Sequence, residues 1–245
     1  MKKSRLKTFF VYGMGVFAAV FIIILLMLSP LFNVTKVIVE GNKRVSGESI
    51  QRGLGLGSPS SVNVFLFERR GALERLNNPY IESISIDKAY FSREITVTVI
   101  ERRLIGFVEF AHGQYLYIDE NGLVLEAATS FSERLPIIVG LDLPGFTVGA
   151  PLEVTNEHAL RDLQEISRFL SRHEIESDVI RVDVNDSSNI RLFINNLVVS
   201  FGDTTDGDRK MQMLIQILNH FEGEDIRGTL DISDISRNPI LRHLT

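Results

Sequence analysis

The sequence predicts an α+β protein in which one membrane-spanning helix precedes two domains on the far side of the membrane. Three features carry this prediction: an uncharged apolar run, a strand–helix–helix–strand–strand pattern, and a later series of strand pairs with two amphipathic helices. Strands and helices that are mixed without regular alternation are typical of antiparallel sheets with helices packed on one side. The expected divisions are a tail at 1–8, the membrane helix at 9–28, and domains at 32–102 and 103–245.

The apolar run extends from Phe9 to Leu28 without a charged residue. At about 1.5 Å per residue, a helix of this length spans the roughly 30 Å of a bilayer core. A cleaved signal peptide is the alternative, but residues 26–31 contain no A-x-A-like cleavage site. We therefore expect an uncleaved anchor that contacts the lipid bilayer through Phe9 to Leu28.

Charges around this run predict its orientation. The basic residues that precede it are Lys2, Lys3, Arg5 and Lys7. Because positive charge is retained in the cytoplasm, residues 1–8 form the cytoplasmic tail and the chain after Ser29 lies outside. That outer part holds 22 of the 26 basic residues and all 31 acidic ones, a net charge of −9. Such a surface excludes duplex nucleic acid as a partner, since nucleic acid requires a basic footprint.

The first outer domain reads as a small sheet with two helices. A strand is expected at Val34–Glu40, and Ser46 can cap a short helix that ends in a glycine cluster. A second helix is expected at 68–76, and period-two alternation predicts a hairpin of strands at 81–89 and 94–101.

The second outer domain reads as antiparallel strands with flanking helices. The Asn121-Gly122 pair predicts a tight hairpin turn, and Asn195-Asn196 predicts another. Apolar residues recur at helical spacing after Asn156 and after Asp206. Strands are expected at 115–118, 123–126, 135–141, 179–184, 190–194, 197–201 and 228–233.

Motifs for catalysis or cofactor binding are absent from the sequence. It has no cysteine, no G-x-S-x-G elbow, no H-E-x-x-H helix and no phosphate-binding P-loop. Three acidic or glycine-rich segments suit turns and helix caps better than ligands: 53–57, 119–122 and 203–208. We therefore expect no cofactor, no metal and no enzymatic activity. The alternative is a membrane-bound hydrolase that uses carboxylates such as Glu101, Glu109 or Asp119.

Local patterns in both outer domains occur in the order of a known family. In the first domain they are Val37–Gly41, Asn78-Pro79 with Ile81, Ile95–Val99 and Glu101-Arg102. In the second they are Tyr117–Gly122, Leu135-Pro136, Phe201-Gly202 before a helix with Lys210 and Leu214, and Leu230–Ile232. Behind a signal anchor, this arrangement resembles the bacterial cell-division family FtsQ/DivIB.

The resemblance implies a POTRA domain followed by the β-domain of that family. It also implies a non-enzymatic scaffold of the division septum in the cytoplasmic membrane. The implied partners are the bitopic proteins FtsL and FtsB/DivIC, and through them the septal peptidoglycan synthase FtsW with FtsI. The alternative is a membrane-anchored POTRA scaffold of a secretion or envelope-assembly machine.

We expect partners to bind the last strand region, Thr229 to Leu244, because a sheet edge can pair with a partner strand. Within it, residues 238–244 read either as a weak strand or as a tail. The expected apolar contacts are Leu230, Ile232, Ile240 and Leu241, and the expected charged contacts are Arg237 and Arg242. The alternative for Leu230 and Ile232 is that they fill the core.

Overall fold

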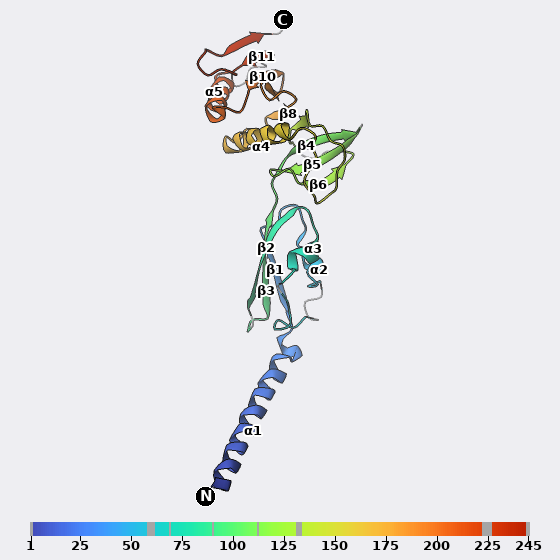
Figure 1. The fold of residues 1–245 in the computed structure, drawn as a ribbon, viewed down its shortest axis with the longest axis vertical. Helices are drawn as coiled ribbons and strands as arrows, with labels where there is room; N and C mark the ends of the chain where they lie inside the picture. The colour runs from blue at the N-terminus through green and yellow to red at the C-terminus, as the bar shows by residue number, and fades with distance from the viewer. Residues whose placement is uncertain are drawn as a thin grey trace. The chain divides into compact units, whose positions relative to one another are not determined.

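The computed structural model describes residues 2–57, 62–68, 70–89, 91–111, 113–130, 134–221 and 227–243. The chain forms two compact units, Met1–Glu101 and Arg102–Thr245 (Figure 1). Each unit combines helices with a β-sheet, which confirms the predicted α+β class.

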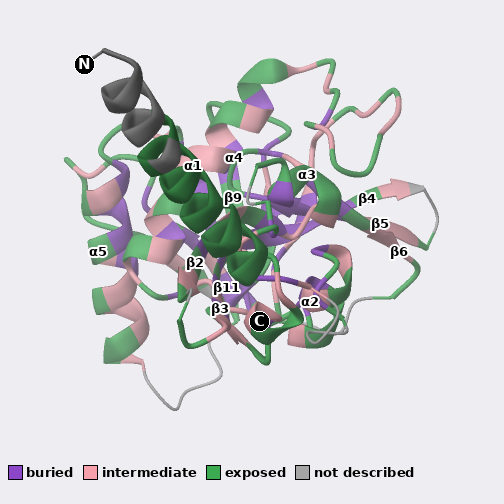
Figure 2. Ribbon diagram, turned by 90° about the horizontal axis from the view of Figure 1, so that it is seen from below, coloured by how far each residue is buried: buried purple, intermediate pink, exposed green. Residues whose placement is uncertain are grey.

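The first unit begins with the long helix α1 (Lys2–Met27), followed by a short 3₁₀ helix at Pro30–Phe32. From Tyr12 to Met27 every side chain of α1 is exposed, as the green ribbon in Figure 2 shows. Among the residues that the structure describes, none of the helices has the length and apolar character of a membrane span. The span expected at residues 9–28 stays a prediction.

The sheet of the first unit has three strands in the order β1-β3-β2. The strands are β1 (Lys36–Glu40), β2 (Ile81–Ala89) and β3 (Glu94–Glu101), and the helices are α2 (Gly47–Gly53) and α3 (Ala72–Leu76). As predicted, β2 and β3 form a hairpin, and the Ser46 side chain caps α2 by accepting from the N–H of Ser49. The second helix is shorter than expected because Gly71 adopts a left-handed conformation, with φ of 64°, immediately before it.

Alternate residues of β3 build the core of this unit. Ile95, Val97 and Val99 are buried and pack with Ile50 and Leu54 of the α2 segment. The polar residues between them face away, which is the alternation that the sequence shows.

The carboxylate of Glu101, at the end of β3, closes the connection between β1 and α2. It accepts hydrogen bonds from the backbone N–H groups of Lys43, Arg44 and Val45 at 2.9–3.0 Å. Burial alone would raise the pKa of Glu101, but these backbone bonds and the Arg44 charge hold it below its ordinary value of 4.5. In the same connection, Gly41 has a φ of 83° and lies so close to Val99 that a side chain would meet its carbonyl oxygen.

The second unit contains one sheet of nine strands in the order β12-β11-β10-β9-β8-β7-β4-β5-β6. The strands are β4 (Leu104–Ala111), β5 (Gln114–Asp119), β6 (Val124–Ala128), β7 (Ile137–Val139), β8 (Val179–Asp183), β9 (Ile190–Ile194), β10 (Leu197–Gly202), β11 (Gly228–Asp231) and β12 (Ile240–His243). Both predicted hairpin turns are confirmed, since β9 pairs with β10 and β5 with β6.

The expectation of a purely antiparallel domain is wrong. The pairs β4–β7, β7–β8 and β10–β11 are parallel. Parallel neighbours need a crossover connection. Helix α4 (Glu157–Arg172) connects β7 with β8, and α5 (Gly207–His220) lies between β10 and β11.

Each of the two helices buries the apolar side chains of one face in the core of this unit. Leu163, Ile166 and Leu170 of α4 are almost fully buried, as are Met211 and Leu214 of α5. These side chains pack with the strand residues in one apolar cluster. The helices are therefore held to the sheet by the apolar spacing that the sequence shows.

We predict that Glu101→Gln lowers the free energy of unfolding by about 1–2 kcal/mol at pH 7, because the charged acceptor of three N–H groups is lost. Since the folded pKa lies below the ordinary one, the stabilisation is present above pH 4.5 and is lost as the pH falls through the folded pKa. Urea denaturation between pH 7 and pH 3 measures it. Glu82→Gln, at an exposed site on β2, is the control. If Glu101→Gln lowers the free energy of unfolding by the same amount at pH 7 and at pH 3, this role of the carboxylate is contradicted.

Candidate partner-binding edge

Strand β12 lies at one end of the nine-stranded sheet and has a single neighbour. It pairs antiparallel with β11, so that Leu230 faces Leu241 and Thr229 faces Arg242. The backbone groups that point away from β11 have no strand beside them in the part of the chain that the structure describes. Leu244, the expected end of this region, lies outside the described residues. The exposed edge of β12 offers hydrogen-bonding groups over about 13 Å.

The opposite end of the sheet, at β6, is partly covered. Val124 donates its N–H to the Ala150 carbonyl, and Gly149 donates to the Val124 carbonyl, at 2.9 and 2.7 Å. Leu123 also forms a bridge with Pro151. The segment 149–151 therefore occupies the start of that edge, and among the described residues no such segment lies along β12.

The side chains expected to contact a partner fall into two groups. Leu230 and Ile232 are each 1% exposed and belong to the core, which favours the alternative interpretation of these two residues. Ile240 is 48% exposed and Arg242 is exposed, whereas Leu241 is half-buried and packs on the core. Ile240 and Arg242 are therefore the side chains that a docked strand would meet first.

Two similar turns shape the connection between β11 and β12. Oδ1 of Asp231 accepts from the N–H and hydroxyl of Ser233 at 3.0 and 2.7 Å, and Oδ1 of Asp234 accepts from those of Ser236 at 2.9 and 2.6 Å. The serine hydroxyl, followed by the serine N–H, lowers the pKa of each aspartate below 3.8. Both carboxylates are therefore charged, and both turns are formed, at neutral pH.

Arg237 extends from the second of these turns. Its side chain is 81% exposed, and its Nε lies 3.1 Å from Oδ2 of Asp234. The backbone N–H of Arg237 also donates to the Asp234 carbonyl. An exposed pair of this kind contributes little to stability, so the guanidinium can exchange partners.

A buried lysine lies at the corner between β10 and α5. Lys210 of α5 is 2% exposed, and its Nζ donates to the backbone carbonyl and to Oδ1 of Asp203 at 2.9 and 3.0 Å. The Nζ also lies 5.3 Å from the centre of the Phe201 ring. The hydrogen bond from Lys210 lowers the pKa of Asp203 below 3.8. The start of α5 is thereby fixed to the end of β10.

Gly202 joins the same corner to the β11–β12 connection. Its φ is 77°, and a side chain at this position would lie 2.8 Å from Cβ of Ser233. Only glycine permits both this conformation and this approach. Gly202 thus allows the end of β10 to lie against Ser233 in the β11–β12 connection.

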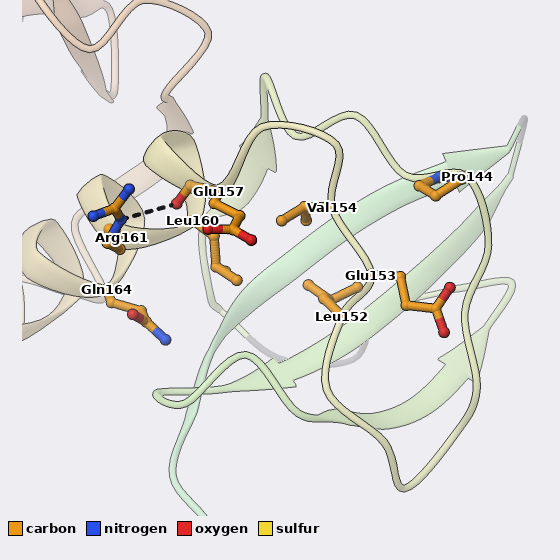
Figure 3. A pocket seen from close by; sticks show the side chains of 8 residues that line it. All are labelled: Pro144, Leu152, Glu153, Val154, Glu157, Leu160, Arg161 and Gln164. Carbon is orange, nitrogen blue, oxygen red and sulfur yellow. Dashed lines mark hydrogen bonds between the residues drawn. The ribbon is translucent and has the colours of Figure 1, made fainter.

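A shallow groove of about 490 Å³ runs along α4 in the second unit (Figure 3). Its lining is Pro144, Leu152, Glu153, Val154, Glu157, Leu160, Arg161 and Gln164. Arg161 donates from Nε to the Glu157 carbonyl within the helix. Its described lining holds two carboxylates, Glu153 and Glu157, and no hydroxyl, imidazole or ammonium group.

Two carboxylates of the hydrolase alternative, Glu109 and Asp119, lie apart on the β4–β5 hairpin. Glu101 closes the connection in the first unit. In the second unit, Glu109 faces Tyr115 and Asp119 faces Leu104, at opposite ends of the β4–β5 hairpin. Asp119 is buried and accepts from the N–H groups of Asn121 and Leu123, as expected of turn chemistry, and Arg102 donates to it at 3.1 Å.

The acidic residues at the start of α5 each have a basic partner. Lys210 pairs with Asp203, Arg209 with Asp206, and Arg172 with Asp208. Within the described ranges, no three acidic or histidine side chains are grouped as metal ligands would be. The ion pairs account for the acidic side chains of this segment.

Comparison with known families identifies both units. The family "Cell division protein FtsQ/DivIB, C-terminal" matches residues 106–234, more than half of the chain. The chain belongs to the FtsQ/DivIB family. The family "POTRA domain, FtsQ-type" matches residues 32–102. The chain is therefore a cell division protein, as its resemblance to the family implies.

Several curated relatives are similar over most of this chain. Cell division protein DivIB of Clostridium botulinum strain Hall is 24% identical over 98% of this chain and 93% of the relative. DivIB of Clostridium tetani is 26% identical over 81% of this chain and 74% of the relative. DivIB of Staphylococcus aureus is 25% identical over 84% of this chain and 45% of the relative.

The sequence carries a signal for only some of the groups that shape the β11–β12 connection and the adjacent corner. The repeated Asp-Ile-Ser at 231–233 and 234–236 is a signal for the two aspartate turns, because serine two residues after aspartate can donate back to it. The burial of Lys210 has no comparable local signal, since the acceptor and the ring that surround it come from another element.

We predict that Asp203→Ala lowers the free energy of unfolding of the second unit by about 2 kcal/mol, because it removes one acceptor from a buried ammonium group. Lys210→Met should cost about 1 kcal/mol, since it keeps the apolar stem and removes the charge. The double variant should be no less stable than Asp203→Ala alone, because no buried charge remains. Urea denaturation of the four proteins measures this. Strictly additive losses would contradict the pairing.

Proposed function

We propose that this protein is a non-enzymatic scaffold of the division machinery and that the outer edge of β12 binds a strand of a partner protein. The observation that carries the proposal is the position of β12 as a four-residue strand with one neighbour at the end of the sheet. A partner strand at this edge would satisfy the unpaired backbone groups, and side chains would provide specificity.

The side chains on β12 suit a partner with mixed apolar and acidic character. Ile240 offers exposed apolar surface, and the guanidinium of Arg242 offers positive charge beside it. Arg237 provides a second positive group on the connection. In this proposal Leu241 has an intermediate role, whereas Leu230 and Ile232 hold the edge in place from the core.

The proposed partners are the bitopic division proteins FtsB/DivIC and FtsL, and through them FtsW and FtsI. Membership of a cell division family supports this choice over a secretion or envelope-assembly machine. A scaffold of this kind binds other proteins and needs no catalytic group. The proposed place of action is the outer side of the cytoplasmic membrane at the division septum.

We further propose that α1 anchors the chain in the membrane through residues 9–28. The support is an uncharged apolar sequence and a helix whose described side chains are exposed, for example Phe17 at 73%. Exposed apolar surface of this extent is costly in water and favourable in lipid. The basic residues Lys2, Lys3, Arg5 and Lys7 would then keep the N-terminus in the cytoplasm.

The proposed domain organisation follows from this anchor. Residues 32–102 form the POTRA domain and residues 103–245 the β-domain, with the tail at 1–8. The range of the POTRA match and the division of the contacts after Glu101 support these bounds.

We predict that Ile240→Lys reduces capture of FtsB/DivIC by at least about tenfold, because the partner loses the burial of one large apolar side chain. Co-purification of the full-length chain from crosslinked cells measures the capture. Ile180→Lys is the matched control, because Ile180 is 52% exposed on β8, a strand with two neighbours. A band of a fluorescent fusion at midcell should persist in the control. Unchanged capture by Ile240→Lys would contradict the edge assignment.

A further inference from the structure

Three large apolar side chains lie exposed at the end of the first unit where α1 enters. Leu31 is 68% exposed, Leu66 is 66% exposed and Phe91 is 92% exposed. We call these three residues the apolar rim. They belong to three segments: the 3₁₀ helix after α1, the turn at 63–67, and the β2–β3 turn. Figure 1 draws the β2–β3 turn at this end of the unit, beside the end of α1.

The turn that carries Leu66 is bonded to the last residues of α1. Asn63 is 7% exposed, and its Nδ2 donates to the carbonyls of Met27 and Ser29 at 3.2 and 2.9 Å. Its Oδ1 accepts from the N–H of Phe65, and its carbonyl accepts from the N–H of Leu66. A buried amide therefore caps the helix end and fixes the Leu66 turn at the same time.

The turn that carries Phe91 is bonded to the same region. Nη1 of Arg93 donates to the Leu31 carbonyl at 2.7 Å, and the Arg93 carbonyl accepts from the N–H of Thr35 at 2.9 Å. Edge-to-face contact between Phe32 and Phe65, with ring centres 5.1 Å apart, packs the adjacent segments together. The segments that carry the three rim residues are therefore hydrogen-bonded to the chain at the end of α1 or just after it.

We propose that the apolar rim is a lipid-contact surface that seats the first unit on the outer face of the bilayer. This inference rests on the proposed anchor. If α1 spans the bilayer, its exposed apolar surface continues through Leu28, which is 47% exposed, into Leu31 and the rim. The short connection and the Asn63 bonds then keep the rim at the lipid interface. The side chains of the rim residues would then leave water and lie in the bilayer at the boundary between headgroups and acyl chains.

The charges beside the rim suit phospholipid headgroups. The guanidinium of Arg93 bonds to a neutral carbonyl, so its charge is available to a phosphate. Lys36 and Glu94, next along the strands, pair at 3.3 Å and neutralise each other. An apolar rim with a cation at its margin is the composition that binds a membrane interface.

The absence of tryptophan from the sequence allows a direct test with single-tryptophan reporters. Phe91→Trp and Leu66→Trp place a reporter on the rim, and both sites are exposed enough to accept the larger ring. Ile100→Trp is the matched control, since Ile100 is 56% exposed near the other end of β3, about 20 Å along the strand from Glu94. Phe17→Trp reports on the anchor itself.

The full-length variants are reconstituted in vesicles of phosphatidylglycerol and brominated phosphatidylcholine. Bromine should quench Phe17→Trp, Phe91→Trp and Leu66→Trp, and leave Ile100→Trp bright. Acrylamide in the water should quench the rim reporters about tenfold less than Ile100→Trp, as expected for a side chain that partitions into the interface.

The outcomes separate the rim from the anchor. If bromine quenches Phe17→Trp while both rim reporters are as accessible to acrylamide as Ile100→Trp, the lipid-contact surface is refuted and the anchor is retained. If bromine does not quench Phe17→Trp, the anchor is refuted and the rim proposal with it. If Phe91→Trp and Leu66→Trp are quenched alike, the result does not come from a local disturbance caused by one of the two substitutions.

Discussion

Each interior strand of a sheet satisfies its backbone on both sides, whereas an edge strand leaves every second N–H and C=O on one side to water or to a partner. In the second unit this constraint applies to the two end strands of the sheet, β12 and β6. Segment 149–151 occupies the start of β6, and β12 has no comparable cover in the part of the chain that the structure describes. The proposed scaffold function follows from this difference between the two edges.

The edge can serve as a docking surface only if the sheet behind it is fixed. The side chains of Leu230, on β11, and Ile232, just after it, are buried in the core. Strand β11 also pairs in parallel with β10, which joins it to the rest of the sheet. Lys210 and Gly202 fix the corner from which the β11–β12 connection continues. A short edge strand on such a support loses little conformational freedom when it binds, which favours affinity.

The sequence was most informative where local pattern decides structure. The alternation in β3, the Asn-Asn turn between β9 and β10, and the helical spacing in α4 all led to correct elements. The parallel pairs were not predicted, because pairing between strands separated by a helix depends on the whole sheet rather than on local periodicity. The second helix begins later than predicted, at Ala72, because the left-handed conformation of Gly71 is not visible in the apolar periodicity.

The candidate site was predicted in part for the same reason. The region after Thr229 does end in an edge strand, but apolar residues alone did not distinguish Leu230, which is buried, from Ile240, which is exposed. That distinction depends on which side of the sheet α5 covers. The buried Lys210 and the buried Asn63 are tertiary features, since their partners are distant in sequence or lie on other elements.

Amide hydrogen exchange on the full-length chain, with and without FtsB/DivIC, tests the central claim most directly. A partner strand on β12 should slow the exchange of alternate amides within residues 240–243, whose N–H groups point away from β11, and leave β6 unchanged. Slowed exchange at β6 with β12 unchanged would contradict the account, as would a bound partner that protects neither edge.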